Sequence, residues 1–407
     1  MSETRSTAGK LNISLLAETP KRAEFLVFGA PLIEEDEIRE VEATLRSGWL
    51  GTGPKTRLFE QRFCEYTGAR YAVALNSCTA GLHLALDVLG IKAGDEVITT
   101  PMTFAATANV ICHVGAKPVF VDIDPITMNL EPEAIARAIT PRTKAIMPVH
   151  FAGRPCDMDA ILAIAHQHRI PVIEDAAHAT ETRYHGQKVG NIGLMSVFSF
   201  YSTKNVVTGE GGMVTTNDPQ LADELRMRSL HGISRDAWKR YTAEGYQPYD
   251  TLYPGYKYNM MDLQASLGLH QLARVERSWE VRDRYWKLYN EGFAELEEVL
   301  IPAPDEPDTK HARHLYTLLL DIDRLKLDRY GVLNALKEEN IGTGVHFIAL
   351  HLHTLYRERF GFQRGDFPNA EWVSDRTISL PLSPRMSERD VRDVIAAVYR
   401  VIRRARK

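Results

Sequence analysis

The stretch that decides the fold is Ser199-Phe-Tyr-Ser-Thr-Lys-Asn-Val-Val-Thr-Gly-Glu-Gly-Gly212, which sets Lys204 between an apolar, strand-like approach and a glycine turn. Upstream, Pro171-Val-Ile-Glu-Asp175 reads as a buried strand that ends in an acid. Open α/β proteins bind ligands at the carboxyl edge of the sheet, so Asp175 is expected there. An amine beside it can form a Schiff base with a carbonyl compound. A lysine and an acid so placed are the two protein groups that a pyridoxal phosphate (PLP) site requires.

Short β-rich runs alternate with helical patterns from about residue 55 to residue 216. The predicted strands are residues 71–75, 96–99, 118–121, 145–149, 171–174, 196–200 and 213–216. This alternation predicts a mostly parallel sheet of seven strands with helices on both faces. A further helix is expected over residues 34–47, with Ile38, Val41 and Leu45 on one face and Gly48 as its stop.

The 407 residues exceed the size at which one core normally stops growing, so two domains are expected. After a helical region over residues 261–296, a proline-rich stretch at 301–307 marks a boundary. Strands over 315–320, 344–347 and 377–380 and helices over 329–339 and 387–402 then predict a small α+β domain. We therefore divide the chain into a flexible extension (1–24), a large PLP-binding domain (25–260), and an interdomain helix with the small domain (261–407).

Composition excludes several classes of protein. The net charge is -4 and the sequence has no run of basic residues, so no nucleic-acid-binding surface is predicted. No apolar stretch approaches the length of a membrane span. The four cysteines have no CxxC spacing, and neither a carboxylate nor a cysteine at ligand spacing accompanies the histidines at 346, 351 and 353, so no metal site is predicted. Residues 1–22 lack the apolar core of a signal peptide, and a cytoplasmic enzyme with reduced thiols is the expectation.

The motifs around these residues resemble the nucleotide-sugar aminotransferases of the DegT/StrS type. The resemblance rests on Glu174-Asp-Ala-Ala-His-Ala179, on the Ser-Phe-x-x-x-Lys-Asn around Lys204, and on Gly209-Glu-Gly-Gly212. Further stretches are similar, in the same order, to the branch that aminates the 4-keto pentose of UDP-4-amino-4-deoxy-L-arabinose synthesis: Ser47-Gly-Trp-Leu-Gly-Thr-Gly-Pro-Lys55, Pro254-Gly-Tyr-Lys-Tyr-Asn-Met260, Gly342-Thr-Gly-Val-His-Phe347, Tyr356-Arg-Glu-Arg-Phe360 and Ser379-Leu-Pro-Leu382. The resemblance implies PLP fold type I, as in aspartate aminotransferase.

The resemblance assigns the reacting groups. Lys204 is the catalytic residue that holds PLP and moves protons, whereas a lone lysine beside a glycine turn would be a solvated side chain. Asp175 pairs with the pyridine nitrogen; the competing interpretation is an N-cap for a helix starting at Ala176. His178 contacts the ring face or its 3′-oxygen, with a core histidine as the close alternative.

Other positions are implied as cofactor and substrate contacts. The amides of Cys78 and Thr79, the Thr79 hydroxyl and Ser199 bind the phosphate, at a helix start that Ser77 also caps. Phe104 stacks on the pyridine, or is a core phenylalanine.

Three more positions concern the neighbouring subunit and the substrate. The segment with Lys257 and Asn259 reaches the partner's cofactor phosphate in a homodimer with shared active sites, and the resemblance leaves open which of the two makes the contact. A surface loop before a helix is the alternative. His346 contacts the sugar or nucleotide.

The implied reaction moves an amino group from L-glutamate to the C4 keto group of a nucleotide-linked sugar, a UDP-4-keto-pentose or related UDP-4-keto-sugar, in glycan or cell-envelope synthesis. A UDP-N-acetyl- or dTDP-4-keto-6-deoxyhexose is the alternative substrate. A PLP-binding regulator without turnover is the alternative from another class. The dehydratase branch is disfavoured because it has histidine where Lys204 stands.

Overall fold

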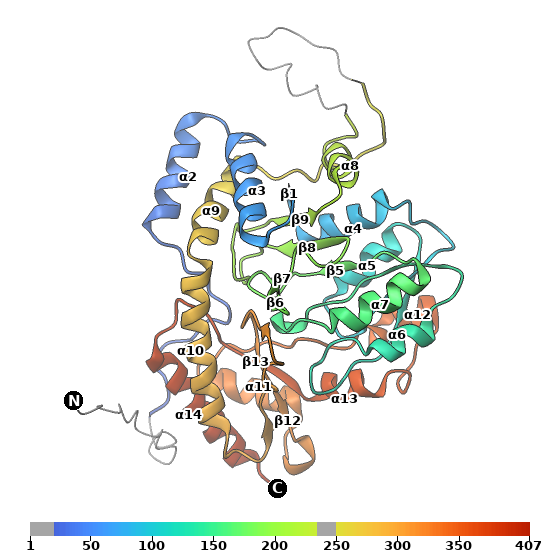
Figure 1. Cartoon of the computed structure of the whole chain (residues 1–407). Coiled ribbons are helices and arrows are strands. Elements are labelled where there is room, and N and C mark those ends of the chain that lie inside the picture. Colours follow the sequence, from blue (N-terminus) through green and yellow to red (C-terminus); the bar gives the residue numbers. More distant parts are fainter. Residues whose placement is uncertain (1–19, 234–249) are drawn as a thin grey trace, which may run out of the picture.

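The computed structural model describes residues 20–233 and 250–407. Residues 1–19 of the predicted N-terminal extension therefore lie outside the described residues. The described chain forms a central sheet with helices around it, and a second, smaller sheet near the C-terminus (Figure 1).

Seven strands of the described chain form the central sheet, in the order β3-β2-β4-β5-β8-β9-β1. Parallel bridges from Ile146 to Val172 and from Val149 to Asp175 join its two halves. Only β9 runs against the other strands. The strands are β1 (Tyr71–Leu75), β2 (Glu96–Thr99), β3 (Lys117–Phe120), β4 (Thr143–Ile146), β5 (Ile173–Asp175), β8 (Met195–Ser199) and β9 (Gly212–Thr216). The predicted seven-stranded, mostly parallel sheet is confirmed.

Helices cover both faces of this sheet because successive strand residues point to opposite sides. Val197 and Val214 join the core beneath α4 (Cys78–Val88), whereas Phe198 and Met213 join the core beneath α3 (Pro54–Thr67) and α9 (Asp262–Ala273). Burying an aromatic or aliphatic side chain of this kind stabilises the fold by about 1.5–3 kcal/mol. The remaining large-domain elements are α5 (Ala105–His113), α6 (Pro132–Ala138), η1 (Phe151–Gly153), α7 (Met158–His168), β6 (Arg183–Tyr184), β7 (Gln187–Lys188) and α8 (Pro219–Ser229).

Helix α2 (Glu35–Ser47) ends at Gly48, whose φ of 73° terminates it as predicted. Its apolar face, however, does not enter the core: Ile38 and Leu45 remain 51% and 53% exposed. The helix instead buries Glu37 and Thr44. Glu37 accepts a hydrogen bond from Gln271 of α9, so polar contacts seat this helix on its neighbour.

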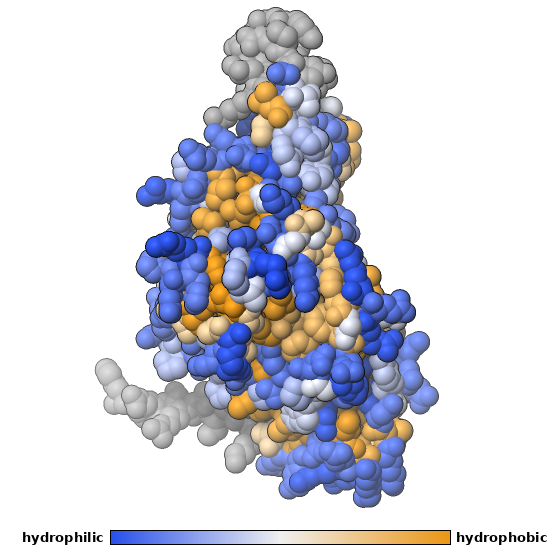
Figure 2. Space-filling model, turned by 90° about the vertical axis from the view of Figure 1, so that its right-hand side faces the viewer, coloured by the Kyte–Doolittle hydropathy of each residue, from blue (hydrophilic) through white to orange (hydrophobic). Residues whose placement is uncertain are grey.

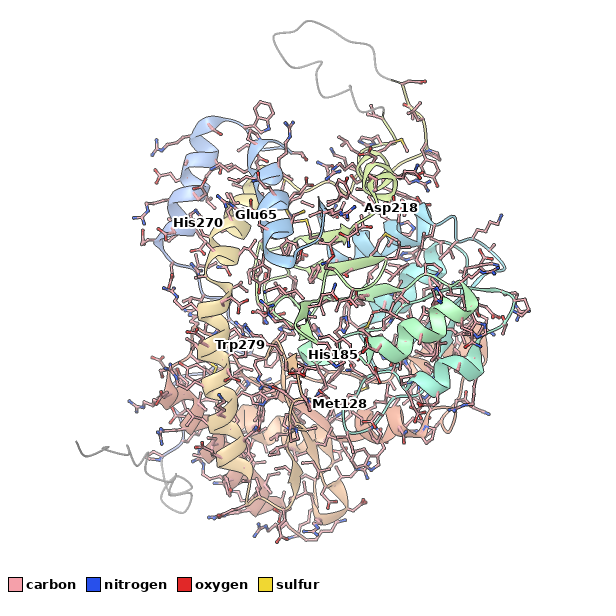
Figure 3. The ribbon with its side chains drawn as sticks, in the orientation of Figure 1. Glu65, Met128, His185, Asp218, His270 and Trp279 are labelled. Carbon is pink, nitrogen blue, oxygen red and sulfur yellow. The ribbon has the colours of Figure 1, made fainter. Side chains whose placement is uncertain are left out.

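The predicted helical region over 261–296 is two helices, α9 and α10 (Val275–Phe293). Figure 1 shows α10 running from the large domain down along the smaller sheet. Side chains tie both helices to their neighbours: His270 of α9 contacts Glu40 of α2, and Trp279 of α10 donates its indole N–H to the His311 carbonyl at 2.8 Å (Figure 3).

The smaller sheet is antiparallel and consists of β10 (Val299–Leu300), β12 (Tyr316–Leu320) and β13 (Thr377–Leu380). It packs with α10, α11 (Arg329–Glu338) and α14 (Glu388–Ala405) around a separate core. Other elements here are β11 (Thr309–Lys310), which pairs with β6, and η3 (Ile322–Arg324), η4 (Leu350–Leu352), α12 (Thr354–Phe360) and α13 (Pro368–Arg376).

The predicted strand over 344–347 is wrong. Only a single bridge, Gly344 to Ser379, is present. The backbone then leaves the sheet, because Phe347 packs edge-on against Phe151 of the large domain and Leu350 donates its N–H to the Pro101 carbonyl. Residues 346–370 thus lie against the large domain, where Tyr356 also donates a hydrogen bond to Asn109 of α5.

The surface on the side of α4, α5 and α12 has hydrophobic side chains gathered near its middle and hydrophilic side chains around them (Figure 2). Among residues 20–233 and 250–407, no helix is long and apolar enough to span a membrane.

Candidate active site

A cavity of about 380 Å³ lies at the carboxyl edge of the central sheet. It brings together residues from six separate stretches of the chain. Of the positions named from sequence, it is lined by Cys78, Thr79, Phe104, Asp175, His178, Ser199, Lys204 and His346.

Lys204 lies in the turn between β8 and β9. The turn is held by backbone bonds from the Lys204 N–H to the Tyr201 carbonyl and from the Thr208 N–H to the Phe200 carbonyl. Burial lowers the pKa of Lys204 to about 8, and Cys78 and Asp175 partly oppose that shift. The lysine is therefore not the solvated side chain of the alternative interpretation.

Asp175 ends β5 and is 4% exposed. Its Oδ2 accepts a hydrogen bond of 2.7 Å from the Thr107 hydroxyl, and its Oδ1 accepts one from the Ala177 amide. Burial raises the pKa of Asp175, while these two donors and Lys204 act in the opposite direction. The helix N-cap interpretation is wrong, because residues 176–182 form turns and no helix.

Three histidines of the site are neutral. Burial lowers the pKa of His178 and of His314 well below its ordinary value, and burial together with Lys204 lowers that of His346 to about 4. His178 lies parallel to Phe347 and 4.5 Å from His314 between ring centroids. Its Nδ1 is buried and has no hydrogen-bond partner among the described residues.

The start of α4 forms an anion site beside Lys204. Ser77 caps the helix by accepting the Ala80 N–H at 3.1 Å, which leaves the first amides directed at the cavity. Gly212 of β9 permits this approach, since a Cβ there would lie 2.5 Å from the Cys78 nitrogen. Ser199, at the end of β8, adds a hydroxyl to the same cavity.

Phe104 is 64% exposed, so the core-phenylalanine interpretation is wrong. Its ring lies at the cavity, 6.4 Å from that of Phe347. Tyr201, also exposed, lines the same cavity. Two exposed aromatic rings thus border the place where a ligand would enter.

Lys257 and Asn259 are not among the residues that line the cavity of their own chain. The Asn259 amide donates a hydrogen bond of 2.7 Å to Thr52. Lys257 is exposed, whereas the neighbouring Tyr256 and Tyr258 stack on each other and contact His83. Lys257 is thus an exposed residue outside the lining of its own cavity.

Sequence reasoning missed Thr107, Tyr201, Glu210, Phe347 and His314. Thr107 carried a usable signal, because it lies three residues after Phe104 and so on the same side of the first turn of α5. His314 had none, since it reaches the site from the small domain. Within the described residues no group of three histidine, cysteine or carboxylate side chains could hold a metal ion, and the four cysteines are free.

The residues present fit PLP. A half-buried amine matches the aldehyde, a helix start with two hydroxyls matches the phosphate, and a cationic ring nitrogen would stabilise the buried Asp175 carboxylate. The unpartnered His178 Nδ1 shows that the site holds a polar group that residues 20–233 and 250–407 do not satisfy. On this sheet topology, such a site defines a PLP-dependent aminotransferase of fold type I.

The model of the DegT/DnrJ/EryC1/StrS aminotransferase family matches residues 31–399, and the chain belongs to this family. It is 56% identical over 381 residues to an uncharacterized protein of Methanocaldococcus jannaschii, covering 94% of this chain and 98% of that one. It is 51% identical over 386 residues to the spore coat polysaccharide biosynthesis protein SpsC of Bacillus subtilis, covering 95% and 99%.

Among solved structures, the chain is similar to Spr1654 of Streptococcus pneumoniae, a protein assigned as a sugar aminotransferase. Its PMP form superposes with a TM-score of 0.88 at 36% identity, covering 93% of this chain and 99% of that one. Its PLP form gives a TM-score of 0.87. PLP is therefore the cofactor and a sugar the kind of substrate for this family. The likeness to the arabinose branch is not among these findings.

Proposed function

We propose that the protein transfers the amino group of L-glutamate to the C4 keto group of a nucleotide-linked sugar, a UDP-4-keto-pentose or a related UDP-4-keto-sugar. One observation carries the proposal: an amine of lowered pKa and a buried carboxylate line one cavity with a phosphate-type helix start. That set serves amino-group transfer, whereas binding alone does not require a lysine of lowered pKa.

Lys204 is the proposed proton carrier. At pH 7 a pKa of about 8 leaves roughly one amine in ten unprotonated, against fewer than one in a thousand for an ordinary lysine. The neutral amine of Lys204 would hold the cofactor at its carbonyl carbon with loss of water, and the same amine, once released by the amino donor, would move the proton at the donor's Cα. When bound, PLP supplies the electron sink for the Cα carbanion.

The other residues orient the reacting groups. Asp175 keeps the ring nitrogen protonated, and the Thr107 and Ala177 donors hold its carboxylate in place. The α4 amides with Thr79 and Ser199 fix the phosphate end. His178 has its unpartnered nitrogen buried beside the ring site, and because it stays neutral it adds no competing charge.

The sugar assignment is supported by chemistry at the cavity rim and by one relative. Phe104 and Tyr201 offer exposed aromatic faces to an uncharged ring, and His346 is a neutral hydrogen-bonding group. SpsC is named for polysaccharide biosynthesis. A 4-keto nucleotide sugar has a carbonyl group that an amine can attack. It also has an uncharged sugar ring that the aromatic side chains at the cavity rim can contact.

The proposal includes a homodimer with shared active sites. Large apolar side chains remain exposed on α2, on the loop after it and on α3, and such gathered surface marks an interaction site. These residues are Ile38, Leu45, Trp49, Leu50 and Leu58. An exposed lysine without a side-chain bond in its own described chain suits the phosphate of a partner's cofactor, so we assign that contact to Lys257.

Two measurements test the function. Purified protein with PLP should show an absorption band that glutamate bleaches, and amino-group transfer to a panel of 4-keto nucleotide sugars should be seen by mass spectrometry. The panel includes UDP-4-keto-pentose, UDP-N-acetyl-4-keto-6-deoxyhexose and dTDP-4-keto-6-deoxyhexose. A band that glutamate leaves unchanged would favour a regulator, and full activity in Lys204→Ala would overturn the mechanism.

A further inference from the structure

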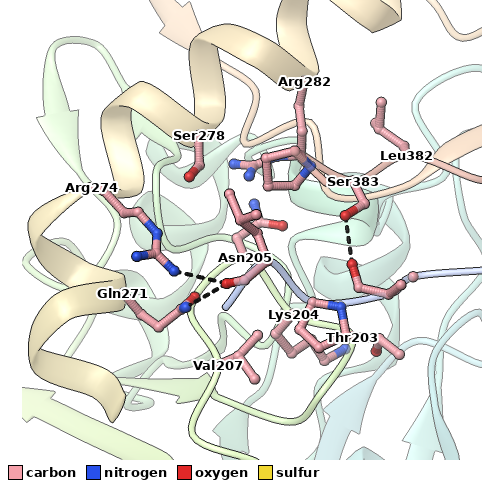
Figure 4. A pocket seen from close by; sticks show the side chains of 15 residues that line it. Thr203, Lys204, Asn205, Val207, Gln271, Arg274, Ser278, Arg282, Leu382 and Ser383 are labelled. Carbon is pink, nitrogen blue, oxygen red and sulfur yellow. Dashed lines mark hydrogen bonds between the residues drawn. The ribbon is translucent and has the colours of Figure 1, made fainter. Parts of the chain in front are cut away.

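Asn205 follows the reactive lysine and has no part in the chemistry above. Figure 4 shows it between Lys204 and Arg282 of α10, in the small space that separates the lysine turn from that helix. Lys204 also lines the main cavity, whereas Asn205, the next residue of the same turn, lines only the small space beside α10.

The Asn205 side chain uses both of its N–H donors and its oxygen in hydrogen bonds. Its Nδ2 donates to Glu181 Oε2 at 2.7 Å and to the Ala312 carbonyl at 3.0 Å. Its Oδ1 lies 3.0 Å from His314 Nδ1. These three partners come from the turns after β5 and from the segment that leads into β12.

Chemistry alone fixes the orientation of this amide. The opposite orientation would set its oxygen against a carboxylate and a carbonyl, neither of which has a proton to give. Oδ1 must therefore face His314, and His314 Nδ1 must carry the proton that it donates. Since His314 is neutral, its Nε2 then bears the lone pair.

Glu181 is the hydrogen-bond acceptor that this orientation needs. It is fully buried and forms an ion pair with Arg282, whose Nε donates to the Arg313 carbonyl. Arg282 Nη1 is buried and unpartnered among the described residues, beside a cavity of about 20 Å³, room for one water. The guanidinium of Arg282 pairs with the Glu181 carboxylate, and that carboxylate accepts the N–H that orients the Asn205 amide.

We propose that Asn205 is a positioning residue: through Glu181 and Arg282 it holds the Lys204 turn against α10 and the small domain, and it fixes His314 as the Nδ1–H tautomer beside His178. The proposal rests on Lys204 being the reactive amine of the proposed function. Lys204, His346, Arg282 and His311 add to burial in lowering the pKa of His314, so a second proton there would add a cation among positive or basic side chains.

The tautomer can be observed directly in the protein without cofactor. Protein labelled with ¹⁵N-histidine should give, for His314, one nitrogen shift typical of N–H at Nδ1 and one typical of a lone pair at Nε2. The His314→Gln variant assigns these signals by their loss. A wild-type His314 with its proton on Nε2, or with two protons, overturns the proposal.

Asn205→Ala removes the acceptor, so the His314 signals should move towards a mixture of the two tautomers. Asn129→Ala is the control: Asn129 is buried, donates to two backbone carbonyls and accepts one amide N–H, and none of these partners is a histidine. Both variants should lose stability, but only Asn205→Ala should move the His314 signals. Unchanged His314 signals in Asn205→Ala overturn the proposal.

Turnover separates positioning from stability. Asn205→Ala should lower kcat by on the order of 10- to 100-fold with a smaller change in KM, because a displaced lysine turn mainly affects the reacting step. Wild-type kcat in Asn205→Ala would contradict the positioning role. Full activity in Lys204→Ala would sink the proposed function instead and would leave the tautomer result standing.

Discussion

The hydroxyl of Thr107 donates a hydrogen bond of 2.7 Å to Asp175 Oδ2, and so joins helix α5 to the end of strand β5. Because its proton is used there, Thr107 must accept at 2.8 Å from Thr103. The acid that we propose as the partner of the ring nitrogen is thus held by a short chain of hydroxyls.

Thr107→Val keeps the shape of the side chain and removes its proton. A hydrogen bond to a charged group contributes about 1.5–3 kcal/mol, so kcat/KM should fall roughly 10- to 100-fold. Steady-state kinetics with glutamate measure this. Thr103→Val removes the bond that Thr107 accepts and should cost less, even though Thr103 also lines the cavity. A larger loss in Thr103→Val would contradict the chain of hydroxyls.

Asp175→Asn should stabilise the cofactor-free protein while it inactivates the enzyme. Burial raises the pKa of Asp175 in the folded state, so folding binds a proton that the unfolded chain releases, and stability falls as pH rises through that pKa. The substitution removes this loss. Thermal melting without PLP should show a gain over wild type at pH 8 that shrinks as the pH is lowered towards the ordinary pKa of an aspartate, and activity should fall by about 10²–10³-fold. A lower midpoint at pH 8 would argue against the raised pKa.

Covalent uptake of PLP by the cofactor-free protein should depend on pH. The rate should rise up to about pH 8, the pKa of Lys204, and level off above it, because only the neutral amine reacts. Absorbance kinetics across pH 6–10 measure the inflection, and Lys204→Arg, charged throughout, is the control without uptake. The lowered pKa also means that the unfolded chain binds the extra proton between about pH 8 and 10.5, so stability should rise with pH in that window. An inflection above pH 10 would contradict burial as the cause.

Lys257→Gln should weaken PLP binding about tenfold, as the loss of one charge-assisted contact implies. Mixing Lys204→Ala subunits with Lys257→Gln subunits should restore one complete site per heterodimer and recover tight binding. If no recovery follows, the contact is not shared between subunits. Asn259→Ala, whose amide is bound to Thr52, should change affinity less.

The segment that carries Lys257 is anchored at Asp87 of α4. Asp87 accepts hydrogen bonds from Tyr253 at 2.9 Å and from Arg228 at 3.0 Å. Asp87→Asn should therefore weaken PLP binding in the same direction as Lys257→Gln, by a smaller factor, in a fluorescence titration of the cofactor. Unaltered affinity would show that this anchor has no influence on the contact.

Gly212→Ala should disturb the start of α4, where we propose that the cofactor phosphate binds. The added Cβ would lie 2.5 Å from the Cys78 nitrogen, which is backbone and cannot turn away, so about 1–3 kcal/mol of stability should be lost together with cofactor affinity. Gly51→Ala meets nothing within 4 Å and is the control. Chemical denaturation with and without PLP measures both; equal effects in the two variants would contradict the steric argument.

The sheet was predictable because each strand is short, apolar and bounded by turn residues, and the motifs on it placed Lys204 and Asp175 at one edge. The prediction failed where contacts between distant segments decide the outcome. Ile38 and Leu45 read as a core face, but α2 is seated on α9 by Glu37 and the apolar side chains stay exposed. Residues 344–347 read as a strand, but packing of Phe347 on the large domain takes them out of the sheet. No local sequence pattern predicts the hydrogen bond between His314 and Asn205 either, because the two residues lie far apart in the chain.

The segment 346–370 lies against the large domain although it follows Lys204 by more than a hundred positions. During synthesis, the proposed cofactor contacts up to residue 212 are translated first, whereas His346 and Phe347 are added more than a hundred residues later. At about 5–20 residues per second, this interval is on the order of ten seconds. A nascent chain therefore has the reactive amine before it has the wall that encloses it, and its reactive site becomes complete only near the end of translation.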